Sequence, residues 1–129
     1  MSPTTAAQQN APITLEQQRA QFAWDCARAG VQVAGDEYRN LAKAAPALIM
    51  NNGLMQTLAF YQDKNKDHHR TLAAQLRRWI MQRAGANGQD PGFQTMMERL
   101  LRAQPEQYRQ ATDEALLILR WIRQFAAAL

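Results

Sequence analysis

The stretch YRQATDEALLILRWIRQFA at residues 108–126 decides the fold class, because its apolar residues recur at the spacing of an α-helix. The residues that share its apolar face are Tyr108, Ala111, Ala115, Leu119, Ile122 and Ala126. Pro105 suits the first turn of this helix, where a missing N–H costs nothing. A helix from Pro105 to about Ala126 would be about 30 Å long, whereas the radius of gyration of a compact domain of this length is roughly 14 Å. We therefore expect a long C-terminal helix that crosses the whole molecule.

The chain before this stretch is also helical in pattern, because β-branched residues are sparse and no segment alternates apolar and polar residues. Thr14 and Gln17 have the spacing of a capping box at the start of the first helix. Further boundaries are expected at Gly35 and at Pro46, and the low helix propensity of residues 51–53 predicts a kink or a cap there. The predicted helices cover about 15–33, 37–44, 47–62, 67–84, 93–103 and 105–126.

These elements predict an all-α, compact, single-domain helical bundle of about six helices. The 129 residues are enough for one domain, which we place at residues 13–129, after a flexible N-terminal tail at residues 1–12. The single cysteine, Cys26, excludes an intramolecular disulfide, and this fits a reducing cytoplasm. No uncharged stretch reaches the roughly 18 apolar residues of a membrane-spanning helix. We expect a cytoplasmic protein without membrane contact.

The positive charge of the chain is concentrated in one segment. Residues 64–83 hold six basic residues and one acid, whereas the other 109 residues hold nine basic and ten acidic residues. On a helical wheel Arg70 and Arg77 lie nearly in line on the side opposite the apolar residues, and Arg78 lies at its edge. Such a cationic face attracts a phosphate backbone, but it is equally typical of a solvated helix surface.

A second surface feature is predicted on the C-terminal helix. Leu117 and Trp121 lie one turn apart, nearly opposite the apolar face. An exposed Leu–Trp pair is the kind of anchor that protein partners use, although a helix covered by neighbours on both sides would explain the pair as well.

No catalytic or metal-binding constellation is evident in the sequence. His68 and His69 are adjacent, so their side chains diverge on a helix, and we expect both to be solvated at a helix start. Cys26 falls on an apolar stripe without an adjacent base, which predicts a buried structural thiol. We therefore expect no enzyme activity, no cofactor and no bound metal.

Three segments together resemble a known family. They are TLEQQRAQFAWDCA at 14–27, APALIMNNGLMQTLAFYQDK at 45–64 and YRQATDEALLILRWIRQFA at 108–126, 53 residues in all. They are similar to the small all-helical fifth subunit of the type III-B CRISPR–Cas effector, the Cmr complex. The middle segment, with its Asn-Asn-Gly-Leu run, is the most specific. Residues 65–104 match only in being helical and basic.

The resemblance implies a non-catalytic subunit of an RNA-guided complex in antiviral defence. Several copies would stack along the guide–target RNA, beside the repeated backbone subunit and the large subunit of the complex. Combined with the cationic face, it predicts contacts with phosphates and 2′-hydroxyls of guide and target RNA. The candidate RNA-backbone residues are Arg70, Arg77, Arg78, Lys64, Lys66 and Arg83. The alternative is a helical protein–protein adaptor without nucleic-acid contact, anchored at Leu117 and Trp121.

Overall fold

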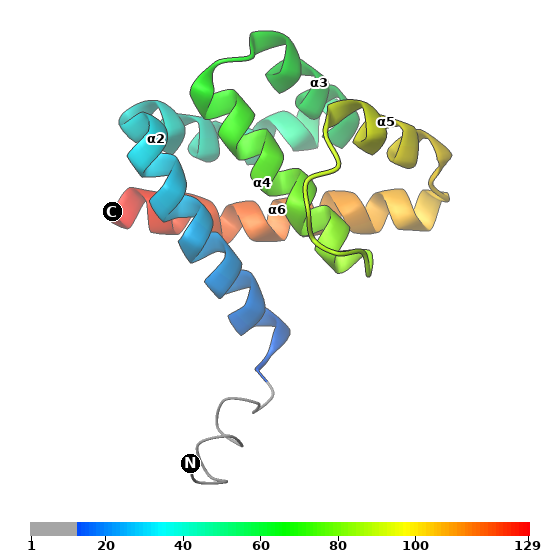
Figure 1. Ribbon diagram of the computed structural model, residues 1–129, viewed down its shortest axis with the longest axis horizontal. Helices are drawn as coiled ribbons and strands as arrows, with labels where there is room; N and C mark the ends of the chain where they lie inside the picture. Colours follow the sequence, from blue (N-terminus) through cyan, green and yellow to red (C-terminus); the bar gives the residue numbers. More distant parts are fainter. Residues whose placement is uncertain (1–12) are drawn as a thin grey trace, which may run out of the picture.

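The computed structural model describes residues 13–129, and every regular element within them is a helix (Figure 1). The predicted tail at residues 1–12 lies outside the described residues. The elements are α2 (Leu15–Asn52), α3 (Leu54–Lys64), α4 (Asp67–Arg83), α5 (Phe93–Arg102) and α6 (Pro105–Ala128). The all-α prediction is confirmed, with five helices over residues 13–129 where six were predicted. Across the same residues, no helix combines the length and apolar content that crossing a bilayer demands.

The helix α2 begins at the predicted capping box and bends at Gly35. The Thr14 hydroxyl accepts the Gln17 N–H at 3.0 Å, and the Gln17 side chain accepts the Thr14 N–H at 2.8 Å. Gly35 has φ 53° and ψ −125°, which turns the second arm of α2 away from the first (Figure 1). The bend confirms the predicted boundary at this glycine.

The predicted break at Pro46 is wrong, because Pro46 lies inside the second arm of α2. A proline in a helix interior costs about 3 kcal/mol, since its ring clashes with the preceding turn and its hydrogen bond is missing. Here Ala42, Ala45 and Ile49 are buried on the same arm, and this packing holds the helix through the proline. The chain breaks instead at Gly53, with φ 88°, within the segment where a kink or cap was predicted.

The core lies where α6 crosses α2 and α4, and α6 runs across the width of the molecule as predicted (Figure 1). Its buried residues are Ala115, Ile118, Leu119, Ile122 and Ala126. The buried face of the first arm of α2 is made of small residues, because Ala23, Cys26, Ala27 and Gly30 are buried while Val33 is 54% exposed.

The two arms of α2 are joined to α4 by buried polar contacts. The Tyr38 ring occupies the space beside Gly30, where an added Cβ would lie 2.2 Å from the ring carbons. The Tyr38 hydroxyl donates to Gln75 Oε1 at 2.6 Å, and Gln75 Nε2 donates to the Cys26 carbonyl at 2.9 Å. Each buried side-chain polar atom of Gln75 therefore has a partner, as burial requires.

Candidate nucleic-acid interface

Arg77, which the sequence placed on an exposed cationic face, is buried. It is 7% exposed, and its Nε and Nη2 atoms lie 2.6 Å and 3.0 Å from the two carboxylate oxygens of Asp90. Asp90 belongs to the connection between α4 and α5, and it also accepts the Gly92 N–H. The prediction that Arg77 faces solvent is wrong, because this connection folds back over that side of α4. Arg77 holds the connection in place.

The carboxylate of Asp90 is correspondingly stabilised in its charged form. Burial by itself would raise the pKa of Asp90, but hydrogen bonds from Arg77 and Gly92 outweigh it and hold the pKa below its ordinary value.

Arg78 is half-buried between α4 and the first arm of α2. Its guanidinium lies 5.3 Å from the centroid of the Phe22 ring, a cation–π distance. Its Nη2 atom also lies 3.9 Å from Cys26 Sγ. The Arg78 guanidinium therefore contacts groups of the same chain and is less accessible to an outside ligand.

Three exposed cations of the predicted set gather where α3 passes into α4, whereas the fourth, Arg83, lies at the far end of α4. Lys64 and Lys66 are exposed, and neither forms an ion pair with an acid of the described chain. The Lys64 ammonium lies 5.4 Å from the centroid of the exposed Phe60 ring. Arg70 is exposed as well, but it is paired with Asp67. We call Lys64, Lys66 and Arg70 the α3–α4 corner.

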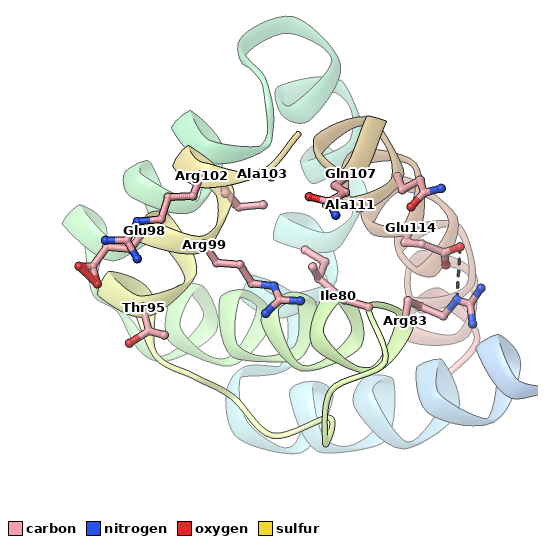
Figure 2. A pocket seen from close by; sticks show the side chains of 13 residues that line it. Ile80, Arg83, Thr95, Glu98, Arg99, Arg102, Ala103, Gln107, Ala111 and Glu114 are labelled. Carbon is pink, nitrogen blue, oxygen red and sulfur yellow. Dashed lines mark ion pairs between the residues drawn. The ribbon is translucent and has the colours of Figure 1, made fainter. Parts of the chain in front are cut away.

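Arg83 stands at the rim of a groove of about 740 Å³ between α4, α5 and α6 (Figure 2). Arg99 and Arg102 of α5 line the same groove, and Arg99 reaches toward its middle (Figure 2). The charge distribution along the chain does not single out the two α5 arginines, because they lie outside the segment with the positive excess. Their i,i+3 spacing was the signal that placed them on one side of α5.

One carboxylate, Glu114 of α6, joins this region to the core. It accepts hydrogen bonds from Arg19 at 2.7 Å and 3.2 Å and from the Trp79 indole at 3.0 Å, and Arg83 lies 3.5 Å away. Burial would raise the pKa of Glu114, but the hydrogen bonds from Arg19 and Trp79 and the nearby cations lower it overall. Glu114 therefore connects α2, α4 and α6 as a charged centre.

Leu117 and Trp121 are partly buried rather than fully exposed. Trp121 packs against Phe125, with ring centroids 5.5 Å apart, and Phe125 meets Trp24 of α2 edge-on at 5.3 Å. Trp24 is 37% exposed. The anchor predicted on α6 is therefore part of an aromatic cluster shared by α2 and α6.

The expectation for the histidines is corrected by burial. His69 is 8% exposed, its ring lies 5.5 Å from that of Tyr61, and its Nδ1 has no hydrogen-bond partner within residues 13–129. Burial, followed by the nearby positive groups, lowers the pKa of His69 and favours the neutral ring. His68 is partly buried, and its Nδ1 atom lies 3.7 Å from Glu37 Oε2. The sequence could not show that α3 packs over this first turn of α4.

Cys26 is buried, as predicted, and burial raises the pKa of its thiol to about 12. Over the described chain no three His, Cys, Asp or Glu side chains converge in a way that would hold a metal ion.

Comparison with known proteins gives a consistent result. The family model described as CRISPR-associated protein (Cas_Cmr5) matches residues 15–129. This chain belongs to the Cmr5 family. A curated relative, the CRISPR system Cmr subunit Cmr5 of Thermus thermophilus, is 31% identical over 117 residues, covering 90% of this chain and 96% of the relative. An X-ray structure of a CRISPR-associated Cmr5 family protein from Thermus thermophilus matches with a TM-score of 0.74 at 30% identity, over 92% of this chain and 98% of that one.

Membership of the Cmr5 family confirms the resemblance to the small helical Cmr subunit of type III-B CRISPR systems. The match also includes residues 65–104, where the resemblance had rested on helical and basic character alone. The segment 45–64, the most specific part of the resemblance, forms the end of α2, the break at Gly53 and all of α3. There the Tyr108 hydroxyl accepts the Met55 N–H at 3.2 Å, which ties the start of α3 to α6.

Proposed function

We propose that this chain is a non-catalytic small subunit of a type III-B RNA-guided effector in the cytoplasm. Several copies would stack along the guide–target RNA, next to the backbone and large subunits, and supply cations to the RNA backbone. Membership of the Cmr5 family is the observation that carries this proposal. A scaffolding role without chemistry is supported by Cys26, whose buried thiol has a pKa of about 12 and is therefore a poor nucleophile at neutral pH.

The structure changes which residues are the best candidates for RNA contact. Arg77 and Arg78 are engaged inside the protein, by Asp90 and by the Phe22 ring. Lys64 and Lys66 are exposed and have no acidic partner among the described residues, so they keep their charge available to an outside phosphate. Arg70 and Arg83 are exposed but share their charge with Asp67 and Glu114.

A direct test is to assemble the effector with the full chain carrying Lys64→Ala and Lys66→Ala. Retention of guide RNA and capture of complementary RNA are measured against salt concentration. The slope of log K against log salt is negative, and each lost phosphate contact should make it less negative by about 0.7. The matched control is Arg120→Ala with Arg123→Ala, which removes the same charge from exposed positions of α6. Unchanged RNA capture by the lysine variant would refute the role of the α3–α4 corner.

A helical adaptor that binds only protein is the second candidate function, because two of the predicted RNA-contact arginines are neutralised by acids of the same chain. Arg70 and Arg77 are both bound to acids of the same chain, and the aromatic cluster around Trp121 presents a partly exposed apolar surface. Co-purification of the tagged chain from its host separates the two candidates. Cmr subunits together with guide transcripts support the effector role. Protein partners without small RNA, and no crosslinks from this chain to RNA in the assembled particle, support the adaptor.

A further inference from the structure

The groove between α4, α5 and α6 combines features of a ligand site that the predicted RNA-contact residues do not explain. We propose that it holds one unstacked nucleotide of a single-stranded RNA segment, with the phosphate on Arg99 and the base against the apolar floor. The proposal rests on the proposed function for the presence of RNA, and it adds where and how a strand is held.

The arginines that line the groove have few acidic partners. Arg99 has no ion-pair partner among the described residues, although it reaches into the groove (Figure 2). Arg83 at the rim has only Glu114, at 3.5 Å, and that carboxylate is already bound at shorter distances by Arg19 and Trp79. The groove thus contains guanidinium groups whose charge is not fully compensated within the protein. A phosphate matches the planar, forked donors of arginine.

The three arginines that line the groove differ in direction. In Figure 2 Arg99 reaches toward the middle, Arg83 lies across from it beside Glu114, and Arg102 is turned outward beside Glu98. Arg99 is therefore the cation that a phosphate inside the groove would meet.

The rest of the groove lining is neutral. Ile80, Leu100 and Ala111 line the groove together with the amide side chains of Gln107 and Gln110. The Gln107 oxygen accepts the Gln104 N–H at 3.0 Å in the capping box of α6, whereas Gln110 is exposed. The Gln110 amide offers both donors and an acceptor, as the edge of a base requires, and the apolar groups suit the face of a base. The volume of about 740 Å³ falls in the range of roughly 300–1,000 Å³ that is typical of ligand pockets. A base within a continuous A-form duplex could not enter such a groove, which is why the proposal names an unstacked nucleotide.

Binding of a short single-stranded oligouridylate to the full chain tests this proposal. Fluorescence anisotropy at several salt concentrations gives the dissociation constant and its salt slope. Arg99→Ala should raise the dissociation constant about three- to tenfold. It should also make the slope of log K against log salt less negative by about 0.7. Gln110→Ala should weaken binding without changing the slope, because an amide contact releases no counterion. Arg120→Ala, which removes one exposed charge from α6 outside the groove, is the matched control and should change binding less than about twofold.

Heteronuclear NMR of the same chain, at millimolar oligonucleotide, locates weak binding. Shifts of the Arg99 and Gln110 side-chain signals support the proposal. Shifts confined to the α3–α4 corner, or no shifts at all, overturn the groove proposal. The proposed function is then still tested separately by RNA capture in the assembled effector. Uridine monophosphate binding as tightly as the oligonucleotide would show a free-nucleotide site, and equal competition by a polyglutamate peptide would show a general carboxylate site. Either result overturns the proposal. Groove binding together with an effector that forms without this chain would retain the inference and refute the proposed function.

Discussion

Replacing Glu114 by Gln should destabilise the fold strongly, although the substitution preserves shape. Glu114 takes a two-pronged contact from Arg19 and a third hydrogen bond from the Trp79 indole. The glutamine amide keeps one oxygen as an acceptor, but its NH₂ group would face a guanidinium. The change therefore leaves the Arg19 charge without a counterion between α2 and α6.

The magnitude follows from the burial of the pair. Breaking a fully buried ion pair costs roughly 3–5 kcal/mol. The side chains of Arg19 and Glu114 are 15% and 14% exposed, so water still reaches part of both groups, and one acceptor remains in the variant. We expect a loss of about 2–3 kcal/mol in the free energy of unfolding, against the roughly 5–15 kcal/mol that is typical of whole domains.

Urea unfolding followed by circular dichroism at pH 7 measures this loss. Glu106→Gln is the matched control, because Glu106 lies on the same helix and pairs with Arg109, but the two side chains are 66% and 70% exposed. The control should cost less than about 0.5 kcal/mol. If the two variants were equally stable, the interpretation of Glu114 as the charged centre of the core would be refuted.

The stability difference should also depend on pH in a defined direction. The pKa of Glu114 is lower in the folded protein than its ordinary value, so the folded state favours the carboxylate. The resulting stabilisation is fully present above the unfolded-state pKa of about 4.3 and is lost as the pH falls through the folded-state pKa. The gap between the wild type and Glu114→Gln should therefore be constant near neutral pH and should narrow below about pH 4. A gap that widened on acidification would contradict this assignment.

Three further substitutions test individual contacts. Gly30→Ala should cost about 1–3 kcal/mol despite the better helix propensity of alanine, because the new Cβ would lie 2.2 Å from the Tyr38 ring. A raised thermal midpoint would show that the ring moves freely. Arg39→Ala removes two 3.0 Å hydrogen bonds to the carbonyls of Ala126 and Leu129, so amide exchange in the last turn of α6 should accelerate. Unchanged exchange there would rule out this capping role. Arg77→Ala should make the connection at residues 84–92 more sensitive to limited proteolysis, because the ion pair with Asp90 is lost. An unaltered cleavage rate would show that Arg77 does not hold the connection against α4.

The parts of the fold that the sequence predicted well are those set by local signals. The capping box at Thr14, the proline at the start of α6 and the glycine breaks at Gly35 and Gly53 each act through residues within one turn. The start of α4 at Asp67 and that of α5 at Phe93 also match the predicted bounds. Such signals do not depend on what packs against the helix.

The errors arise where distant segments meet. Pro46 was expected to break a helix, but its neighbours are buried, and packing outweighs the local cost. His69 was expected in solvent, but Tyr61 of α3 lies against it. Arg77 was expected in solvent, but Asp90 folds back on it. A helical wheel gives the direction of a side chain and contains no information about which segment covers that direction.

This limitation matters most for locating the nucleic-acid interface. The excess of positive charge at residues 64–83 is a property of the sequence that the fold redistributes, because Asp90 lies outside the segment and neutralises Arg77 within it. The attraction of a phosphate depends on the cations that remain uncompensated and exposed. By that criterion Lys64 and Lys66 remain candidates for RNA contact and Arg77 does not, whereas Arg99 becomes a candidate although it lies outside residues 64–83. A set of variants chosen from charge density along the chain would include Arg77→Ala. Any effect of that variant on RNA binding would come from displacement of the α4–α5 connection, because Arg77 pairs with Asp90. The loss of a cation reports on RNA contact only where that cation has no acidic partner in the fold.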